Sequence, residues 1–255
     1  MFRWCAYCLR FLGESAPWAD FASSHGVCSS CEGTGCIDDA EALARVRPVI
    51  ELGAELLRVA ERGLDLEGAG SVATRFLERG RALGLRPADM LLGVVQPALY
   101  EVGRRWSQGL LDASMEARLT IFCESVLDAL VVDQMHRAPP VTGRTSFLLV
   151  AEGNRHTLGI RIFGFVLRES GRDVRVVVDP QEPSWVARLV RAMDADVVGV
   201  SLADPADVAY AGRVASALRD AGLDTRTVVG GFGARDLAPD AVPEGVRVVV
   251  SFSQL

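Results

Sequence analysis

The stretch SFLLVAEGNRHTLG, residues 146–159, decides the fold of the second half of the chain. Residues 146–151 form a continuous apolar run of strand length, which is typical of a strand buried on both faces of a sheet. Gly153 and Asn154 favour a turn after it, and a helical pattern begins near residue 157. The stretch therefore predicts a strand, a short loop that carries His156, and a helix.

The same alternation continues toward the end of the chain. Further apolar runs at 174–178, 197–202, 225–231 and 246–250 are separated by helical segments near 157–170, 184–193, 205–221 and 234–239. Apolar strands that alternate with helices predict a doubly wound, flavodoxin-like α/β domain with a five-stranded parallel sheet. Ligands bind such sheets at the carboxyl ends of the strands. The loops 152–159, 202–205 and 230–233 are therefore the candidate site.

The region before this domain has a helical pattern throughout. Apolar residues recur every three or four positions and predict helices at 39–62, 69–83, 87–107 and 112–135, with Gly63, Gly84 and Gly109 as stops. Short connections between such helices favour an antiparallel four-helix bundle. The predicted domains are a Cys-rich segment at 1–37, the bundle at 38–138 and the α/β domain at 139–255, with a linker at 138–145.

Spacing singles out His156 and two later positions. A histidine in a loop is more often structural than functional, but here 41 residues separate Gly159 from Ser201, at the end of the third predicted strand. A further 28 residues separate Ser201 from the pair Gly230-Gly231, at the end of the fourth. These three elements are therefore expected at one edge of the sheet.

The pattern Asn154-x-His156-x-x-Gly159, Ser201-x-Ala203, Gly230-Gly231 resembles the cobalamin-binding fold, whose signature is Asp-x-His-x-x-Gly, Ser-x-Leu and Gly-Gly at matching intervals. The resemblance implies a corrinoid whose nucleotide tail inserts beside the sheet, with His156 as the lower ligand of cobalt. The glycines would leave room for the tail, and Ser201 would hydrogen-bond to its base. The alternative is an ordinary flavodoxin-like domain with glycine turns. The implied site comprises Asn154, His156, Thr157, Leu158, Gly159, Ser201, Leu202, Gly230, Gly231 and Phe232.

Two positions depart from this signature. Asn154 replaces the usual carboxylate; it is expected to accept the Nδ1 proton of the imidazole without supplying negative charge, so the bond from cobalt to His156 would be weaker. Glu152 lies nearby and is expected to substitute in part. Ala203 replaces leucine, which is a packing change.

The segment 96–109, followed by Glu116, resembles the helix-bundle half of corrinoid modules, most closely that of light-sensing, adenosylcobalamin-dependent regulators. That family carries Trp, nine residues, then Glu-His, and this chain has Trp106, nine residues, then Glu116-Ala117. The resemblance implies that Trp106, with Val102, packs near the adenosyl group and that Glu116 hydrogen-bonds to it. Core packing of Trp106 and solvation of Glu116 are the alternatives. Ala117 leaves no histidine for the upper face of the corrin.

The N-terminal cysteines follow a metal-binding spacing. Cys5-x-x-Cys8 and Cys28-x-x-Cys31, 19 residues apart, have the zinc-knuckle-like spacing of a tetrahedral thiolate site. Zinc is the first candidate and rubredoxin-like iron the second, while free reduced thiols are the alternative. Four protein ligands would make the site structural, and Cys36 would be a spare thiol. A segment this short is not expected to fold without a metal.

Composition excludes several kinds of function. All 27 basic residues are arginine, which rules out a catalytic or P-loop lysine. The net charge of −6 makes direct DNA binding unexpected. No membrane span or signal peptide is recognisable, so a cytoplasmic protein is predicted. With no catalytic constellation evident, the chain is not expected to be an enzyme.

These observations favour a cobalamin-binding regulator that binds adenosylcobalamin, senses light or cobalamin state, and controls a protein partner or transcription. A homo-oligomer is compatible with this role. The first alternative is a corrinoid carrier subunit of a methyltransferase system. The second is a sensor that binds haem or another tetrapyrrole on the same fold.

Overall fold

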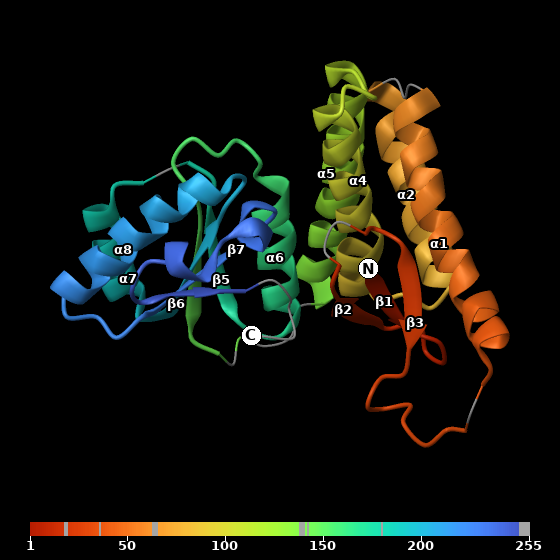
Figure 1. Ribbon diagram of the computed structural model, residues 1–255, viewed down its shortest axis with the longest axis horizontal. Helices are drawn as coiled ribbons and strands as arrows, with labels where there is room; N and C mark the ends of the chain where they lie inside the picture. The colour runs from red at the N-terminus through yellow and green to blue at the C-terminus, as the bar shows by residue number, and fades with distance from the viewer. Residues whose placement is uncertain are drawn as a thin grey trace. The chain divides into compact units, whose positions relative to one another are not determined.

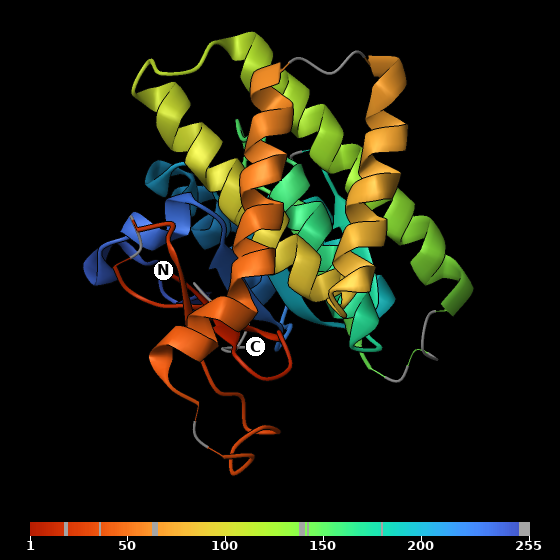
Figure 2. The same ribbon diagram turned by 90° about the vertical axis from the view of Figure 1, so that its right-hand side faces the viewer.

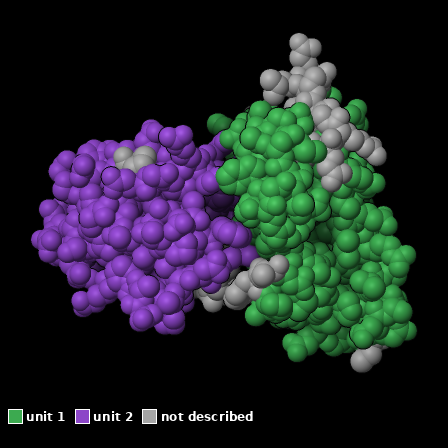
Figure 3. Space-filling view, turned by 45° about the horizontal axis from the view of Figure 1, so that its top comes forward, with its two compact units in different colours: residues 1–136 green, residues 137–255 purple. Residues whose placement is uncertain are grey.

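The chain forms two compact units, residues 1–136 and 137–255, in a computed structural model that describes residues 1–17, 20–35, 37–62, 66–137, 141, 143–179 and 181–249 (Figures 1 and 3). The predicted boundary after residue 37 lies inside the first unit, which contains both the Cys-rich segment and the helices. Cys36, Gly63 and most of residues 138–142 lie outside the described residues.

The second unit is built on a five-stranded parallel sheet, as predicted. Its strands are β4 (Thr145–Val150), β5 (Asp173–Val177), β6 (Ala195–Ser201), β7 (Arg226–Gly230) and β8 (Val246–Val248). The order across the sheet is β5-β4-β6-β7-β8. All neighbouring strands run parallel. The carboxyl ends of β4, β6 and β7 therefore lie side by side.

Helices cover the two faces of this sheet. Helices α7 (Pro183–Met193) and α8 (Val208–Asp220) pack on the face that carries Phe147, Leu149 and Val198. Helix α6 (Leu158–Glu169) covers Leu148 and Val150 on the other face. Successive side chains of a strand point to opposite faces, so the apolar runs read from the sequence are divided between two cores.

The predicted helix at 234–239 is wrong. Residues Gly233–Asp236 and Pro239–Ala241 form two short 3₁₀ turns instead. Proline lacks an amide hydrogen and forces the residue before it out of the helical region, and Ala238 before Pro239 is extended at ψ 140°. Pro239 therefore ends helical structure that the apolar spacing alone favoured.

The first unit contains the long helices that the periodicity predicted. They are α1 (Asp39–Arg62), α2 (Leu66–Ala82), a continuous helical segment at 87–107 and α5 (Ala113–Arg137). Helix α1 contacts α2 and α4 (Figure 2). Phe76 of α2 meets Phe122 of α5 edge to face, at 5.9 Å between ring centroids. Their role as a four-helix cap over a corrin stays a prediction. No helix in the described part of the chain is long and apolar enough to cross a membrane.

The segment 87–107 is not one regular α-helix. It consists of α3 (Pro87–Met90), a π-helical turn η1 (Leu91–Val95) and α4 (Gln96–Ser107). The wide turn contains Gly93, where a Cβ would lie 2.2 Å from the ring of Trp4. Trp4 belongs to a small sheet of β1 (Phe2–Cys5), β2 (Phe11–Glu14) and β3 (Ser23–Gly26), in the order β2-β1-β3. The N-terminal sheet thus packs directly against the middle of the helical segment 87–107.

Candidate functional site

Main-chain hydrogen bonds tie together the three loops that the spacing singled out. The amide of Ala151, after β4, donates to the carbonyl oxygen of Ser201 at 3.1 Å. The amide of Leu202 donates to the carbonyl oxygen of Gly230 at 2.8 Å, and that of Gly233 to Leu202 at 3.2 Å. The loops after β4, β6 and β7 therefore form one continuous edge.

Asn154 is buried within this edge, with 7% of its surface exposed. Its Nδ2 donates to the carbonyl oxygen of Ser201 at 3.0 Å, and its Oδ1 accepts the main-chain amide of His156 at 2.8 Å. These contacts show that Asn154 shapes the loop, and an ionised carboxylate lacks the donor that Ser201 requires. That Asn154 also accepts the Nδ1 proton of the imidazole stays a prediction.

His156 stands at the surface of the loop. Its main chain is fixed by Asn154, and its side chain is exposed. Thr157 occupies the N-cap position of α6, and Leu158 beside it is buried. Glu152, expected to assist His156, pairs with Arg213 at 2.6 Å. Within the described residues, the imidazole is free to bind a ligand from outside the chain.

The glycines of the edge serve two different purposes. Gly231 has φ +100°, and a Cβ there would lie 2.6 Å from the carbonyl oxygen of Leu202, so the fold itself requires glycine. At Gly230 a Cβ would lie 3.2 Å from the carbonyl oxygen of Val249. At Gly159 a Cβ would meet nothing within 4 Å, so this position faces open space. Phe232, next to the pair, is 45% exposed.

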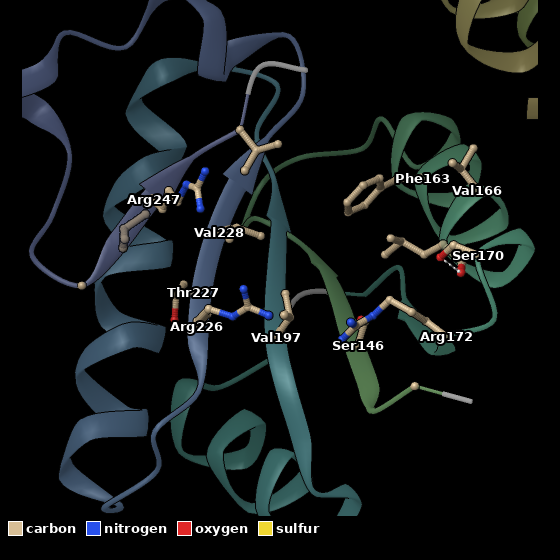
Figure 4. Close-up of a pocket in the computed structure, with 15 residues that line it drawn as sticks. Ser146, Phe163, Val166, Ser170, Arg172, Val197, Arg226, Thr227, Val228 and Arg247 are labelled. Carbon is tan, nitrogen blue, oxygen red and sulfur yellow. Dashed lines mark hydrogen bonds between the residues drawn. The ribbon is translucent and has the colours of Figure 1, made fainter. Parts of the chain in front are cut away.

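A cavity of about 700 Å³ lies on the α6 side of the sheet (Figure 4). Phe163 and Val166 of α6 form one wall, and Val197 and Val228 come from β6 and β7. These residues were not predicted from the sequence. Strand alternation puts Ser201 on the same face as Val197, and Gly230 on the same face as Val228, so this face leads from the predicted site to the cavity. The period-two pattern of the strands was the signal available for finding it.

The opposite end of the cavity is polar. Arg172 donates to Ser146 Oγ at 2.6 Å and pairs with Asp196. Arg226 pairs with the same carboxylate at 3.4 Å. Ser146, Asp196 and Arg226 lie at the amino ends of β4, β6 and β7, and Arg172 comes directly before β5. This end of the sheet is opposite the edge that carries His156. The cavity is therefore apolar along the sheet and charged at its far end.

The residues predicted to cover the upper face of a corrin lie in the first unit. Trp106, near the end of α4, is 55% exposed, so the alternative that it packs in the core is wrong. Val102, one turn earlier, is buried. Glu116 is half-buried, and its Oε1 accepts a hydrogen bond from Thr120 Oγ1 at 3.0 Å. The roles of these residues toward a ligand stay predictions.

Four cysteines meet at the N-terminal sheet. The Sγ atoms of Cys5, Cys8, Cys28 and Cys31 all lie within 4.8 Å of one another. Burial raises the pKa of Cys5, but main-chain amides of Cys28, Cys8 and Tyr7 outweigh it and lower the pKa to about 6. Hydrogen bonding to the Cys28 side chain raises the pKa of Cys31 to about 12. The predicted ligand set is thus brought together in space.

Comparison with known proteins identifies the second unit. Residues 145–252 match the family model of the B12 binding domain. The fold also resembles that of the Methanosarcina barkeri monomethylamine corrinoid protein, with 13% identity, a TM-score of 0.63, and coverage of 80% of this chain and 93% of that one. Residues 145–252 therefore form a B12 binding domain.

Two further solved structures match more distantly. The first is a novel cobalamin-binding protein from Desulfitobacterium hafniense DCB-2, with 20% identity, a TM-score of 0.38, and coverage of 75% of this chain and 87% of that one. The second is the methanol:cobalamin methyltransferase complex from Methanosarcina barkeri, with 18% identity, a TM-score of 0.40, and coverage of 84% and 80%. No curated protein matches the chain.

Proposed function

We propose that this chain is a cobalamin-dependent regulator, in which His156 is the lower axial ligand of cobalt and the upper ligand of the corrinoid is the signal. The observation that carries the proposal is the continuous edge formed by the loops after β4, β6 and β7. This edge presents an exposed imidazole at the carboxyl ends of the strands, in a domain matched by the B12 binding family model.

The residues present fit the lower half of a corrinoid. A neutral imidazole nitrogen is a good cobalt ligand, and that of His156 has no competing partner among the described residues. Phe163, Val197 and Val228 line a cavity of suitable character for a flat, aromatic tail base. Gly159 faces open space in which a ligand would otherwise meet a Cβ. Cobalamin, when bound, would supply a photolabile bond between cobalt and carbon.

The first unit supports an adenosyl upper ligand. Trp106 exposes 55% of its surface, and an exposed large aromatic ring is a common contact for a flat ligand. Glu116 is a hydrogen-bond acceptor for a ribose hydroxyl group. Loss of the adenosyl group would remove these contacts, and a difference in contacts between two states is what shifts a conformational equilibrium. A protein partner, or a second copy of the chain, would receive the signal, and no catalytic turnover is expected.

Anaerobic titration with adenosylcobalamin, with absorbance spectra recorded in the dark and after illumination, tests the proposal. Wild-type protein should bind and show the spectrum of a histidine-ligated corrinoid, which changes on illumination. His156→Ala should lose that spectrum, whereas Arg155→Ala, an exposed neighbour, should keep it. No binding at high micromolar cobalamin would refute the proposal.

A corrinoid carrier for methyl transfer is the second candidate. The fold likeness to the monomethylamine corrinoid protein, which extends over 80% of this chain, favours it. A carrier should accept methylcobalamin as readily as the adenosyl form, reach Co(I) under a strong reductant, and respond to light only through the cofactor itself. A regulator should instead change its oligomeric state or partner binding on illumination, which size-exclusion chromatography in the dark and in the light would detect. Metal analysis for cobalt and iron separates both candidates from a haem sensor.

A further inference from the structure

The cysteine cluster lies outside the B12 binding domain and has no role in the proposed cobalamin chemistry. Cys5 ends β1, and Cys28 follows closely after β3. These strands pair in parallel, with Cys5 opposite Gly26. Parallel strands end at the same edge of a sheet, so the two Cys-x-x-Cys turns emerge side by side. Sheet topology therefore explains why segments distant in the sequence meet at one point.

Local hydrogen bonds hold both turns in a compact form. The amide of Leu9 donates to the carbonyl oxygen of Cys5 at 3.0 Å, and the amide of Cys31 to that of Cys28 at 2.9 Å. The amide of Cys28 also points at Cys5 Sγ, at 3.5 Å, where it stabilises negative charge on sulfur. These hydrogen bonds hold the two turns, and with them the four thiol groups, in defined positions.

Distances between the sulfur atoms match a tetrahedral metal centre. Bonds of about 2.3 Å from zinc to sulfur place the four sulfur atoms about 3.8 Å apart. Cys8 Sγ and Cys28 Sγ lie 3.6 Å apart, and no pair in the cluster exceeds 4.8 Å. A disulfide needs a separation of about 2.05 Å, so the four thiols are spaced for a shared ion and not for a covalent pair.

We propose that Cys5, Cys8, Cys28 and Cys31 bind one Zn²⁺ ion, which locks the N-terminal sheet onto the helical segment that carries Trp106. Four zinc–sulfur bonds form as the thiol protons leave to solvent, without any redox change. Four protein ligands leave no open coordination position, so the ion is structural and not catalytic.

Residues next to the cluster join the N-terminal sheet to the helical segment. Trp4, next to Cys5, is fully buried and fills the space above Gly93 in the π-helical turn. The amide of Phe11 donates to Asp89 Oδ1 at 3.0 Å, and Arg86 forms two hydrogen bonds to the same carboxylate, at 2.6 and 2.7 Å. A sheet of three four-residue strands is too small to hold this arrangement alone, so the ion supplies the missing stability.

Metal analysis of the full-length protein, purified from a medium containing both zinc and iron, tests the site. Wild-type protein should carry a single zinc ion, and replacement by Co²⁺ should give the absorption spectrum of a tetrahedral thiolate centre. Cys8→Ala changes an exposed ligand and should remove most of the zinc. Cys28→Ala and Cys123→Ala are a matched pair of buried cysteines, of which only the first should lose metal. Metal-free or iron-loaded wild-type protein, or full zinc content in both ligand variants, would overturn the proposal.

The stabilising effect of zinc on the first unit can be measured without cobalamin, from the melting temperature. Removal of zinc from wild-type protein by a chelator should lower the melting temperature of the first unit by about 5 °C or more, which corresponds to at least 1–2 kcal/mol in a domain of this size. Added zinc should restore it. Chelation should lower the melting temperature of the Cys123→Ala variant by the same amount as that of wild type. An unchanged melting temperature after complete zinc loss would mean that the ion does not hold the sheet on the helix.

Discussion

At the scale of single residues, Asn154 controls the loop that carries His156. Its amide nitrogen and its oxygen are both engaged, one with Ser201 and one with the amide of His156. Because the side chain is buried, neither contact is replaced by water when it is lost. The position therefore decides where the candidate cobalt ligand stands.

Asn154→Asp should destabilise the second unit by about 1–3 kcal/mol, since the donor to Ser201 is replaced by a buried, charged acceptor. Urea unfolding monitored by circular dichroism measures the change. Asp204→Asn provides a control at an exposed site, where it should have a smaller effect. An unchanged midpoint for Asn154→Asp would contradict the structural role assigned to Asn154.

Gly231 is required by the fold, whereas Gly159 is expected to be required only by a bound ligand. Gly231→Ala should destabilise the second unit by about 1–3 kcal/mol, because it combines φ +100° with a close contact to Leu202. Gly159→Ala lies in α6 with open space at its Cβ, so stability should stay the same or rise by up to about 1 kcal/mol. Cobalamin affinity should nevertheless fall. If Gly159→Ala bound cobalamin as tightly as wild type, the open space would not belong to the ligand.

At the scale of elements, local patterns predicted what local forces determine. The apolar runs located the strands of the parallel sheet, because each strand is buried on both faces. The helix expected at 234–239 failed at Pro239, where a proline outweighs apolar spacing. The π-helical turn and the cavity were not foreseen. Both depend on tertiary contacts, such as that between Trp4 and Gly93, which no window of sequence contains.

The π-helical turn offers a direct test of packing between the sheet and the helix. Gly93→Ala would place a methyl group 2.2 Å from the ring of Trp4, so the first unit should lose about 1–3 kcal/mol. Gly103→Ala lies in α4 with nothing within 4 Å and should be neutral or slightly stabilising. Thermal melts of both variants decide the matter. Equal stability of the two would mean that Trp4 moves away at little cost.

Helix α4 should also respond to acid. Glu101 accepts hydrogen bonds from Arg104 and Arg105, and the bond from Arg104 is the main reason why its pKa is lowered. A lowered pKa in the folded state gives stability that is present above the unfolded value, about 4.3, and is lost as pH falls through the folded value. Glu101→Gln should therefore cost about 0.5–1 kcal/mol at pH 7 and less at an acid pH below the folded value, where the carboxyl group is protonated. Urea midpoints at the two pH values measure the difference, and an equal loss at both would contradict it.

At the scale of the whole molecule, the chain has two compact units with two separate chemistries. The first brings four thiols together at its N-terminal sheet and exposes a tryptophan near the end of α4, and the second carries the match to the B12 binding domain. Each unit has its own core, so each is expected to unfold as a cooperative block. A ligand that contacts both units would couple their stabilities, and one that contacts a single unit would not.

Differential scanning calorimetry of wild-type protein should therefore resolve two transitions in the absence of corrinoid. Hydroxocobalamin has no adenosyl group to reach Trp106, so it should raise the transition temperature of the second unit only. At 100 times its dissociation constant it should add about 2.7 kcal/mol to the stability of that unit. Adenosylcobalamin should raise both in the dark, and illumination should return the first to its starting temperature. In the Trp106→Ala variant, adenosylcobalamin should raise only the transition temperature of the second unit, as hydroxocobalamin does. If adenosylcobalamin left the first transition unchanged in wild type, the helices would not be the element that reads the upper ligand, and a carrier role would be the better account of the domain.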